Sequence, residues 1–265
     1  MEINQMNKKS VNRAFLYGDA VKTSFFIRNS KLLFAEESYF FLMASMRKMR
    51  MNIPLSYTLE FFQELFEQEI TNNSWNSGIV NFMAYREESE FALEKSPVSY
   101  YYEFSSTTDV LEIQKSVEVD LMKEINVGVN LLSNIRVSHP ESIYAEVYAK
   151  ENDIDDLILL NPFKRIARSI YGNILLLKDN TILIPKQSEG AYISPLMENF
   201  VTFLHKKAII KVEQEELVAF QSQKADEILI VSDEKGLFTV RKMRNRTFGN
   251  DRFSSFIKLW RESLG

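Results

Sequence analysis

The sequence predicts a mixed α/β (α+β) chain. Stretches with a strand pattern alternate with stretches of helical periodicity, and 265 residues suffice for one large domain or two ordinary ones. Hydrophobic residues make up 45% of the chain and charged residues 26%, which is typical of globular proteins. No internal repeat, low-complexity segment or Pro/Ser-rich linker is present. We expect sheets covered by helices, with a boundary between about residues 120 and 130.

The first half reads as a sheet covered by two helices. Residues 22–29 predict a strand, and apolar residues at helical spacing predict helices over Glu36–Met51 and Leu55–Ile70. Residues 78–86 and 97–104 are rich in aromatic and β-branched side chains, so they predict two further strands.

The second half continues the alternation. Ser138 to Glu141 form a capping-box pattern with Pro140 in the first turn, which predicts a helix start. Another helix should begin at Ser194-Pro195. Strands are expected at 157–161, 173–178, 181–184, 208–212, 227–231 and 237–241, before a final helix that carries Phe253, Phe256, Ile257 and Trp260.

Composition excludes several classes of function. A net charge of −4 argues against a sequence-independent nucleic-acid binder. The chain has no apolar run long enough to span a membrane and no signal-peptide pattern, so we expect a cytoplasmic protein without a membrane partner. Cysteine is absent, and the two histidines, His139 and His205, are far apart in sequence. No disulfide, thiolate metal site or multi-histidine metal centre is therefore expected.

Glycine usage argues against some phosphate-binding enzymes. The chain has only eight glycines and contains neither GxGxxG nor GxxxxGK[ST]. Loops that bring the backbone close to a phosphate usually need glycine. A dinucleotide or nucleoside-triphosphate enzyme of those types is therefore disfavoured.

Five parts of the chain share motifs with one known family in order and spacing: Arg13–Asp19, Phe41–Met46 in the first helix, Tyr148–Asn152 with Asp155–Asn161, Gly172–Lys178 and Ala225–Ile230. The corresponding family motifs include R-x-F-x-Y-G-D-G, AKE-x-G-x-D-D-A-L-L-L-N, S-N-I-F-L-V-K and A-D-E-V-F-L. Over nearly its whole length the chain thus resembles the class IV aminotransferases.

The resemblance implies a two-domain α/β fold, a homodimer, and pyridoxal phosphate (PLP) in the cleft between the domains. On this basis residues 1–124 would form an N-terminal α/β sandwich domain, and residues 125–265 a C-terminal α/β barrel-like domain. The family includes branched-chain and D-amino-acid aminotransferases and aminodeoxychorismate lyases.

The residues that would do PLP chemistry depart from the family pattern. The position of the Schiff-base lysine is Arg136, and a guanidinium, charged at any working pH, cannot form the imine. The glutamate expected against the pyridine nitrogen is Arg168, a cation that would oppose pyridinium formation. Two more family positions, a histidine in the first helix and a strand arginine, are Ser38 and Asn81.

The expected phosphate site is altered too. The arginine of the first helix is Phe41. The G-I-T turn, which offers amides and a hydroxyl at a helix N-terminus, aligns with Ser194, Pro195 and Leu196. Pro195 lacks an amide hydrogen and Leu196 a hydroxyl. A later phosphate-binding position is Asp233, whose charge would repel a phosphate.

Other residues have a functional and a structural interpretation. Lys22, Lys150 or Lys164 would be a relocated Schiff-base lysine, although a solvated helix position suits Lys150 better and a turn suits Lys164. Arg136 and Arg168 would form a pocket for an anion, unless each pairs with a local carboxylate or points to solvent. His139 would act as an acid or base, but a histidine at a helix start is more often structural.

Two surface patterns favour structural roles. Strand alternation explains the aromatic run Tyr100-Tyr101-Tyr102-Phe104 better than a stacking surface does. The basic run from Arg241 to Arg246 suits a solvated loop better than a phosphate site.

The sequence therefore predicts a homologue that keeps the class IV fold but has lost PLP binding and catalysis. It would be a dimeric protein that binds a small anion or a partner protein, with no metal and no catalytic residue at the family positions. The alternative is an active PLP-dependent aminotransferase or aminodeoxychorismate lyase that uses a lysine elsewhere. A third hypothesis is a PLP-independent activity in the same cleft.

Overall fold

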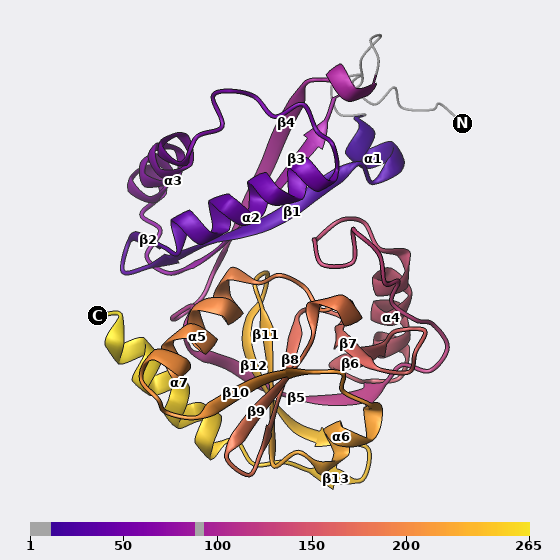
Figure 1. The fold of residues 1–265 in the computed structure, drawn as a ribbon. Helices are drawn as coiled ribbons and strands as arrows, with labels where there is room; N and C mark the ends of the chain where they lie inside the picture. Colours follow the sequence, from indigo (N-terminus) through magenta and orange to yellow (C-terminus); the bar gives the residue numbers. More distant parts are fainter. Residues whose placement is uncertain (1–11, 88–92) are drawn as a thin grey trace.

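The computed structural model describes residues 12–87 and 93–265, which form two sheets flanked by helices (Figure 1). The smaller sheet is antiparallel throughout and has the order β2-β1-β3-β4. Its strands are β1 (Ala20–Arg28), β2 (Lys31–Leu33), β3 (Gly78–Arg86) and β4 (Val98–Ser106).

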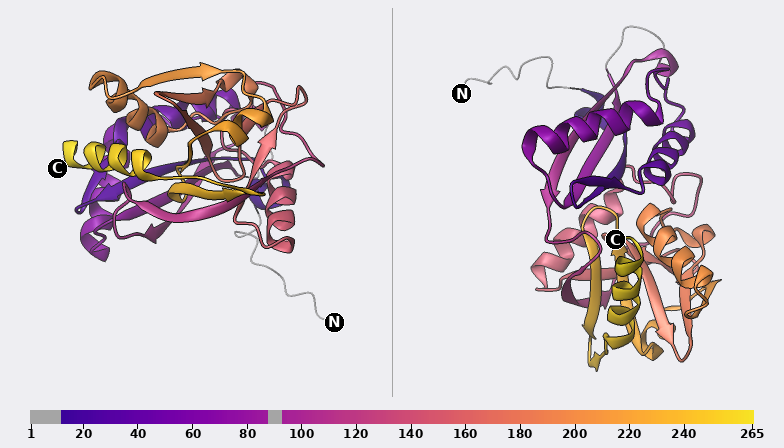
Figure 2. Two further views of the ribbon diagram at one scale, coloured as in Figure 1. Left: turned by 90° about the horizontal axis from the view of Figure 1, so that it is seen from below. Right: turned by 90° about the vertical axis from the view of Figure 1, so that its left-hand side faces the viewer.

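Two helices cover one face of the smaller sheet, as Figure 2 shows from a second side. A short helix, α1 (Arg13–Tyr17), precedes β1, and the two covering helices are α2 (Ala35–Lys48) and α3 (Leu59–Asn73). Phe62 and Phe66 of α3 pack against Phe25 and Phe82 of the sheet. This aromatic core explains why the apolar residues of both helices recur at helical spacing. A 3₁₀ turn, η1 (Leu93–Lys95), precedes β4.

The larger sheet mixes parallel and antiparallel pairs in the order β10-β9-β8-β11-β12-β5-β6-β7, with β13 paired to β12. It curls until β7, at one end, contacts β8. Its strands are β5 (Ile113–Leu121), β6 (Asp156–Leu160), β7 (Ile166–Ser169), β8 (Asn173–Lys178), β9 (Thr181–Pro185), β10 (Lys211–Glu215), β11 (Glu227–Ser232), β12 (Gly236–Met243) and β13 (Arg246–Thr247).

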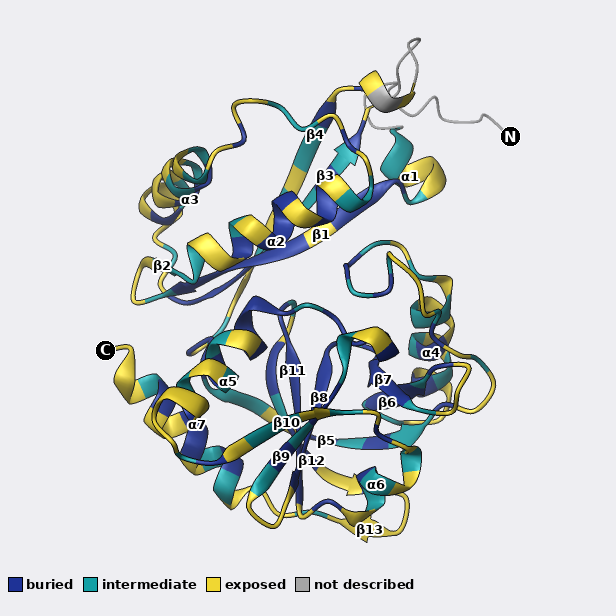
Figure 3. Cartoon of the chain, viewed as in Figure 1, coloured by how far each residue is buried: buried dark blue, intermediate teal, exposed yellow. Residues whose placement is uncertain are grey.

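A shared apolar core joins the two sheets. Phe26 and Ile79 of the smaller sheet are buried together with Phe200 of α5 and Trp260 of α7. Strands β1, β8 and β11 are largely buried, as their dark blue colour in Figure 3 shows. The helices of this half are α4 (Pro140–Glu151), α5 (Pro195–Lys206), α6 (Ala219–Lys224) and α7 (Asp251–Ser263), and η2 (Gln187–Glu189) is a 3₁₀ turn. The smaller sheet is therefore fixed against the larger one, and their facing surfaces can form one site.

The expected domain division differs from the sheet boundary. Strand β5 precedes residue 124, yet it pairs with β12 and β6 of the larger sheet. Residues 107–112 therefore lead from one sheet to the other. Strand β5 was not among the predicted strands, because its many polar side chains obscure the strand pattern in the sequence.

The predicted capping box at Ser138 is wrong. Helix α4 begins at Pro140, and its N-cap is His139, which makes no side-chain capping hydrogen bond. Proline takes the first helical position because its missing N–H is not needed there. Ser138 therefore lies one residue too early to cap the helix.

Most other elements agree with the expectation to within a few residues. The strand predicted at 173–178 is β8 with the same bounds, whereas the strand predicted at 208–212 is β10 at Lys211–Glu215. The final helix buries Phe253, Phe256, Ile257 and Trp260 as expected. Among the described residues, no helix combines the length and the apolar character needed to cross a membrane.

Candidate functional site

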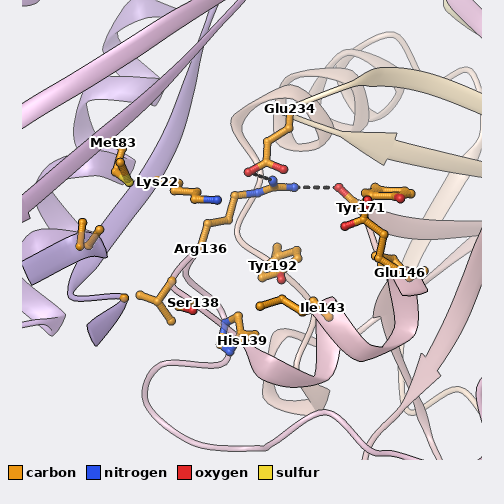
Figure 4. Close-up of a pocket in the computed structure, with 16 residues that line it drawn as sticks. Lys22, Met83, Arg136, Ser138, His139, Ile143, Glu146, Tyr171, Tyr192 and Glu234 are labelled. Atoms are coloured by element: carbon orange, nitrogen blue, oxygen red, sulfur yellow. Dashed lines mark hydrogen bonds and ion pairs between the residues drawn. The ribbon is translucent and has the colours of Figure 1, made fainter. Parts of the chain in front are cut away.

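A cavity of about 370 Å³ lies between the smaller sheet and the start of α4 (Figure 4). Gly18 ends α1 with φ 65°, and a Cβ there would lie only 2.7 Å from the Cβ of Ser138. This close approach brings the α1 end against the segment that enters α4. The lining side chains include Lys22, Met83, Arg136, His139, Ile143, Glu146, Tyr171, Tyr192 and Glu234.

Arg136 is held in place by its backbone and by its guanidinium group. Its carbonyl accepts a hydrogen bond of 2.8 Å from the Lys22 amide, so strand β1 fixes its position. Its guanidinium pairs with Glu234 at 2.7 Å and donates to the Tyr171 carbonyl at 2.8 Å. Of the alternatives left open for Arg136, the structure has the pairing with a carboxylate, and the partner comes from the turn between β11 and β12.

The electrostatics of this pair favour the charged state of both groups. Burial acts to lower the pKa of Arg136, but the attraction of Glu234 and Asp233 outweighs it and raises the pKa. Burial acts to raise the pKa of Glu234, but Arg136 beside it lowers that pKa overall. The cavity wall at this point therefore carries a closed ion pair and not a free cation.

Arg168 lies behind the cavity and is fully buried. Its guanidinium donates to the Gly190 carbonyl at 3.2 Å and lies 3.8 Å from the Glu141 carboxylate. Burial lowers its pKa. The ring of Tyr192 lies 4.3 Å from the Arg168 guanidinium carbon and 4.9 Å from that of Arg136. Both guanidinium groups thus lie against one tyrosine ring, but only Arg136 lines the cavity and it is paired with Glu234, so the two arginines do not form one open cationic pocket.

Asp233 is buried at the start of α5. Its carboxylate accepts a hydrogen bond of 2.7 Å from the Ser194 hydroxyl and one of 3.3 Å from the Leu196 amide. Burial raises the pKa of Asp233, and the nearby Arg136 opposes that change. The structure therefore brings Asp233, Ser194 and Leu196 together, as the sequence analysis expected of one site.

Of the seven positions aligned with the family's PLP site, one faces the cavity. Arg136 lines it, whereas Leu196 lies in the core between the sheets and Phe41 is buried in α2. The side chains that do not line this cavity are Phe41, Arg168, Ser194, Pro195, Leu196 and Asp233. The cleft is therefore open beside Arg136 and does not reach the α5 end.

The three candidate lysines have different surroundings. Lys22 lines the cavity and also a neighbouring one of about 460 Å³, which Asn81 and Tyr101 line as well. The side chain of Lys150 is 72% exposed and pairs with Glu146 one helical turn earlier. Lys164 lies in a turn with φ 60°, and its amide donates to the Asn161 carbonyl.

His139 lines the cavity, with its Nε2 atom 3.3 Å from the Ile135 carbonyl. Burial and the positive charge of Arg168 lower the pKa of His139. This shift favours the neutral ring, which can donate or accept a hydrogen bond.

Sequence reasoning missed four residues of the site. Tyr192, Glu234 and Tyr171 contact Arg136, and the Lys235 amine lies 3.2 Å from the ring centre of Tyr171. Burial lowers the pKa of Lys235, although nearby carboxylates oppose this. The adjacency of Glu234 and Lys235 to Asp233 was the only available signal for two of them.

The surface patterns have structural explanations. Arg241 and Lys242 pair with Glu118, and Arg244 pairs with Asp120, which leaves little free positive charge. Three of the aromatic residues, Tyr100, Tyr102 and Phe104, pack on the core of the smaller sheet, while Tyr101 is exposed. No cluster of acidic or histidine side chains in residues 12–87 and 93–265 could hold a metal ion.

Comparison with known proteins places this site in a family context. Residues 20–243 match the family model for amino-transferase class IV. A relative named "Probable branched-chain-amino-acid aminotransferase" from Aquifex aeolicus (strain VF5) is 20% identical over 237 residues, which cover 87% of this chain and 76% of that protein.

Solved structures share the fold. The branched-chain aminotransferase of Thermoproteus uzoniensis superposes with a TM-score of 0.85 at 14% identity, covering 99% of this chain and 91% of that one. The branched-chain amino acid aminotransferase of Escherichia coli gives 0.84 at 14% identity, over 96% of this chain and 88% of that one. Since the family model matches most of the sequence, the chain belongs to the class IV aminotransferase family.

Proposed function

We propose that this protein keeps the class IV fold without PLP chemistry and binds a small anionic ligand or a partner protein. The observation that carries this proposal is the state of Arg136. The residue aligned with the Schiff-base lysine is a guanidinium, locked by Glu234 and the Tyr171 carbonyl. A guanidinium cannot deprotonate to attack a carbonyl carbon, so this position supplies no nucleophile.

Two further features do not fit PLP held as the resemblance implies. Arg168, aligned with the partner of the pyridine nitrogen, is a buried cation that opposes protonation of that nitrogen. At the phosphate end, Asp233 already accepts hydrogen bonds from Ser194 and Leu196. We therefore route no reaction step through this cofactor.

An anionic ligand is supported by the composition of the open cavity. Glu234 is paired with Arg136 and Glu146 with Lys150, whereas Lys22 forms no ion pair with any described residue. A ligand carboxylate or phosphate near Lys22 would gain a charge-assisted hydrogen bond. Met83 and Ile143 give the same cavity an apolar wall for the body of a small molecule.

A homodimer is proposed with this function. Phe15 and Tyr17 on α1, and Ile143 and Val147 on α4, are at least half exposed, and both helices border the cavity. A second copy of the chain would cover these side chains. Light scattering behind size-exclusion chromatography should give twice the monomer mass, and a monomer mass at every concentration would contradict this.

The decisive experiment mixes the purified protein with PLP, dialyses it, and records the visible spectrum. Borohydride reduction and intact-mass analysis follow. We expect no retained imine band and no stoichiometric adduct. A retained band with one added PLP mass, together with robust transamination of an amino acid, would sink the proposal.

The alternative is an active PLP-dependent aminotransferase or aminodeoxychorismate lyase with a relocated lysine. Among the candidates, the geometry favours Lys22, since it lines the cavity while Lys150 and Lys164 do not. Lys→Ala variants at 22, 150, 164 and 235 separate these cases, because under this alternative one change should erase the adduct.

A further inference from the structure

The N-terminus of α5 is built to attract a negative charge. The helix has 12 residues, and its N-cap Ser194 accepts a hydrogen bond of 3.1 Å from the Met197 amide. Unpaired amides and the helix dipole make such an end favourable for an anion. Pro195, at the first helical position, offers no N–H, so the remaining donors are the Leu196 amide and the Ser194 hydroxyl.

Both remaining donors point at the chain's own carboxylate. One oxygen of Asp233, Oδ1, accepts from the Ser194 hydroxyl at 2.7 Å and from the Leu196 amide at 3.3 Å. The Asp233 residue is only 2% exposed. Burial raises the pKa of Asp233, and the nearby charge of Arg136 opposes that rise. A helix end and a hydroxyl therefore converge on this one side chain.

We infer that the α5 end is an anion-binding site permanently occupied by the internal carboxylate of Asp233. The inference rests on the proposed function for one point, the alignment of this end with the family's phosphate position. It refines that function, because the native ligand would then have no phosphate group bound at α5. An anionic ligand would instead bind on the Lys22 side of the cleft.

Removing the carboxylate should open the site to a small anion from solution. Asp233→Ala leaves the Ser194 hydroxyl and the Leu196 amide without their partner, in a space the size of the lost carboxylate. Formate matches that group in charge and geometry, so it should restore the missing hydrogen bonds. Asp233→Asn is the matched control, because it keeps a side chain of the same size with an acceptor oxygen in place.

The experiment compares thermal unfolding in sodium formate and sodium chloride of equal ionic strength at pH 8. For Asp233→Ala we expect a saturable, formate-specific rise in Tm on the order of 3 °C. The wild type and Asp233→Asn should show no specific rise. Adding Ser194→Ala to Asp233→Ala should abolish it. An equal response in all variants would overturn the inference.

A folding defect does not remove the test. If Asp233→Ala is insoluble in chloride, the yield of folded protein after refolding in formate becomes the measurement, and no recovery at any formate concentration overturns the inference. The outcome is separate from the PLP experiment. PLP capture by the wild type would overturn the proposed function and leave the formate result standing, whereas absent formate rescue would leave a negative PLP result intact.

Discussion

Helices α4 and α5 both begin beside Arg136, and their N-termini differ in how they are capped. Helix α5 has a side-chain cap, Ser194, and a buried carboxylate, Asp233, at its N-terminus. Helix α4 begins at Pro140, its N-cap His139 makes no side-chain capping bond, and its first turn lines the open cavity. The start of α5 therefore has its hydrogen-bonding partners within the chain, whereas the start of α4 faces a cavity that a ligand can enter.

The largest change in stability is expected from Asp156, a buried carboxyl beside the open cavity. Asp156 accepts hydrogen bonds from the amides of Leu157 and Ile170, and Ile170 lines the cavity. Burial raises the pKa of Asp156 from 3.8 to about 7. Because the folded-state pKa of Asp156 lies above its unfolded-state pKa, its protonated carboxyl favours the folded state. This contribution to the free energy of unfolding is complete below about pH 4 and is lost as the pH rises through 7.

Urea unfolding at pH 5 and pH 8 checks this. The wild type should lose about 2–3 kcal/mol of unfolding free energy over that range from Asp156 alone. In Asp156→Asn, whose side chain cannot ionise, the free energy of unfolding should fall by about 2–3 kcal/mol less over the same pH range. The same loss in both proteins would show that Asp156 does not control the pH dependence.

The second prediction tests the two helix starts directly. Asp233→Ala at α5 should cost about 2 kcal/mol, because it leaves two buried donors without an acceptor. His139→Ala at α4 should cost less than about 1 kcal/mol, because no side-chain cap is lost there. Equal losses in urea unfolding would remove the distinction drawn between the two ends.

A smaller loss of stability is expected when the ion pair between Arg136 and Glu234, near the starts of α4 and α5, is removed. Glu234→Gln keeps a hydrogen-bond acceptor for Arg136 but removes the charge, and the Glu234 side chain is 29% exposed. We expect a loss of about 1 kcal/mol at pH 7, reduced further by solvent screening. A loss above about 3 kcal/mol would mean that the pair is far better shielded from water than the structure indicates.

The smallest stability effect is expected for Lys22. Its side chain is exposed, so Lys22→Met should change the unfolding free energy by less than about 0.5 kcal/mol. The same change should weaken binding of benzoate, a probe anion with an apolar body, in an NMR titration. Lys150→Met is the control and should leave benzoate binding unchanged; equal weakening by both would refute a role for Lys22.

The scaffold was largely predictable because its signals are local. The continuous apolar run of β8 and the periodic apolar residues of α5 and α7 identify their elements without knowledge of neighbours. Strand β5 was missed because its pairing with β12 and β6, and not its composition, makes it a strand. The α4 start was misplaced by one residue, since either Ser138 or His139 can precede Pro140 as a cap.

The candidate site was predictable only in part. Residue types alone indicated that position 136 cannot form an imine and that Asp233 disfavours a phosphate. Sequence could not supply Glu234 as the partner of Arg136, or Tyr192 as the ring that both Arg136 and Arg168 contact, because these contacts join distant segments. It also could not tell that the cavity is open beside Arg136, or that Ser194, Leu196 and Asp233 at the start of α5 are buried outside it.

The family fold and the residue types at positions 136, 168 and 233 could be read from the chain alone, since both depend on residue type and local spacing. Which charges meet depends on the packing of the folded chain. Asp233 reaches Ser194 across 39 residues because β11 ends beside the start of α5. A buried charge must find its partner nearby in space, and the packing of the two sheets, which no local pattern encodes, selects that partner.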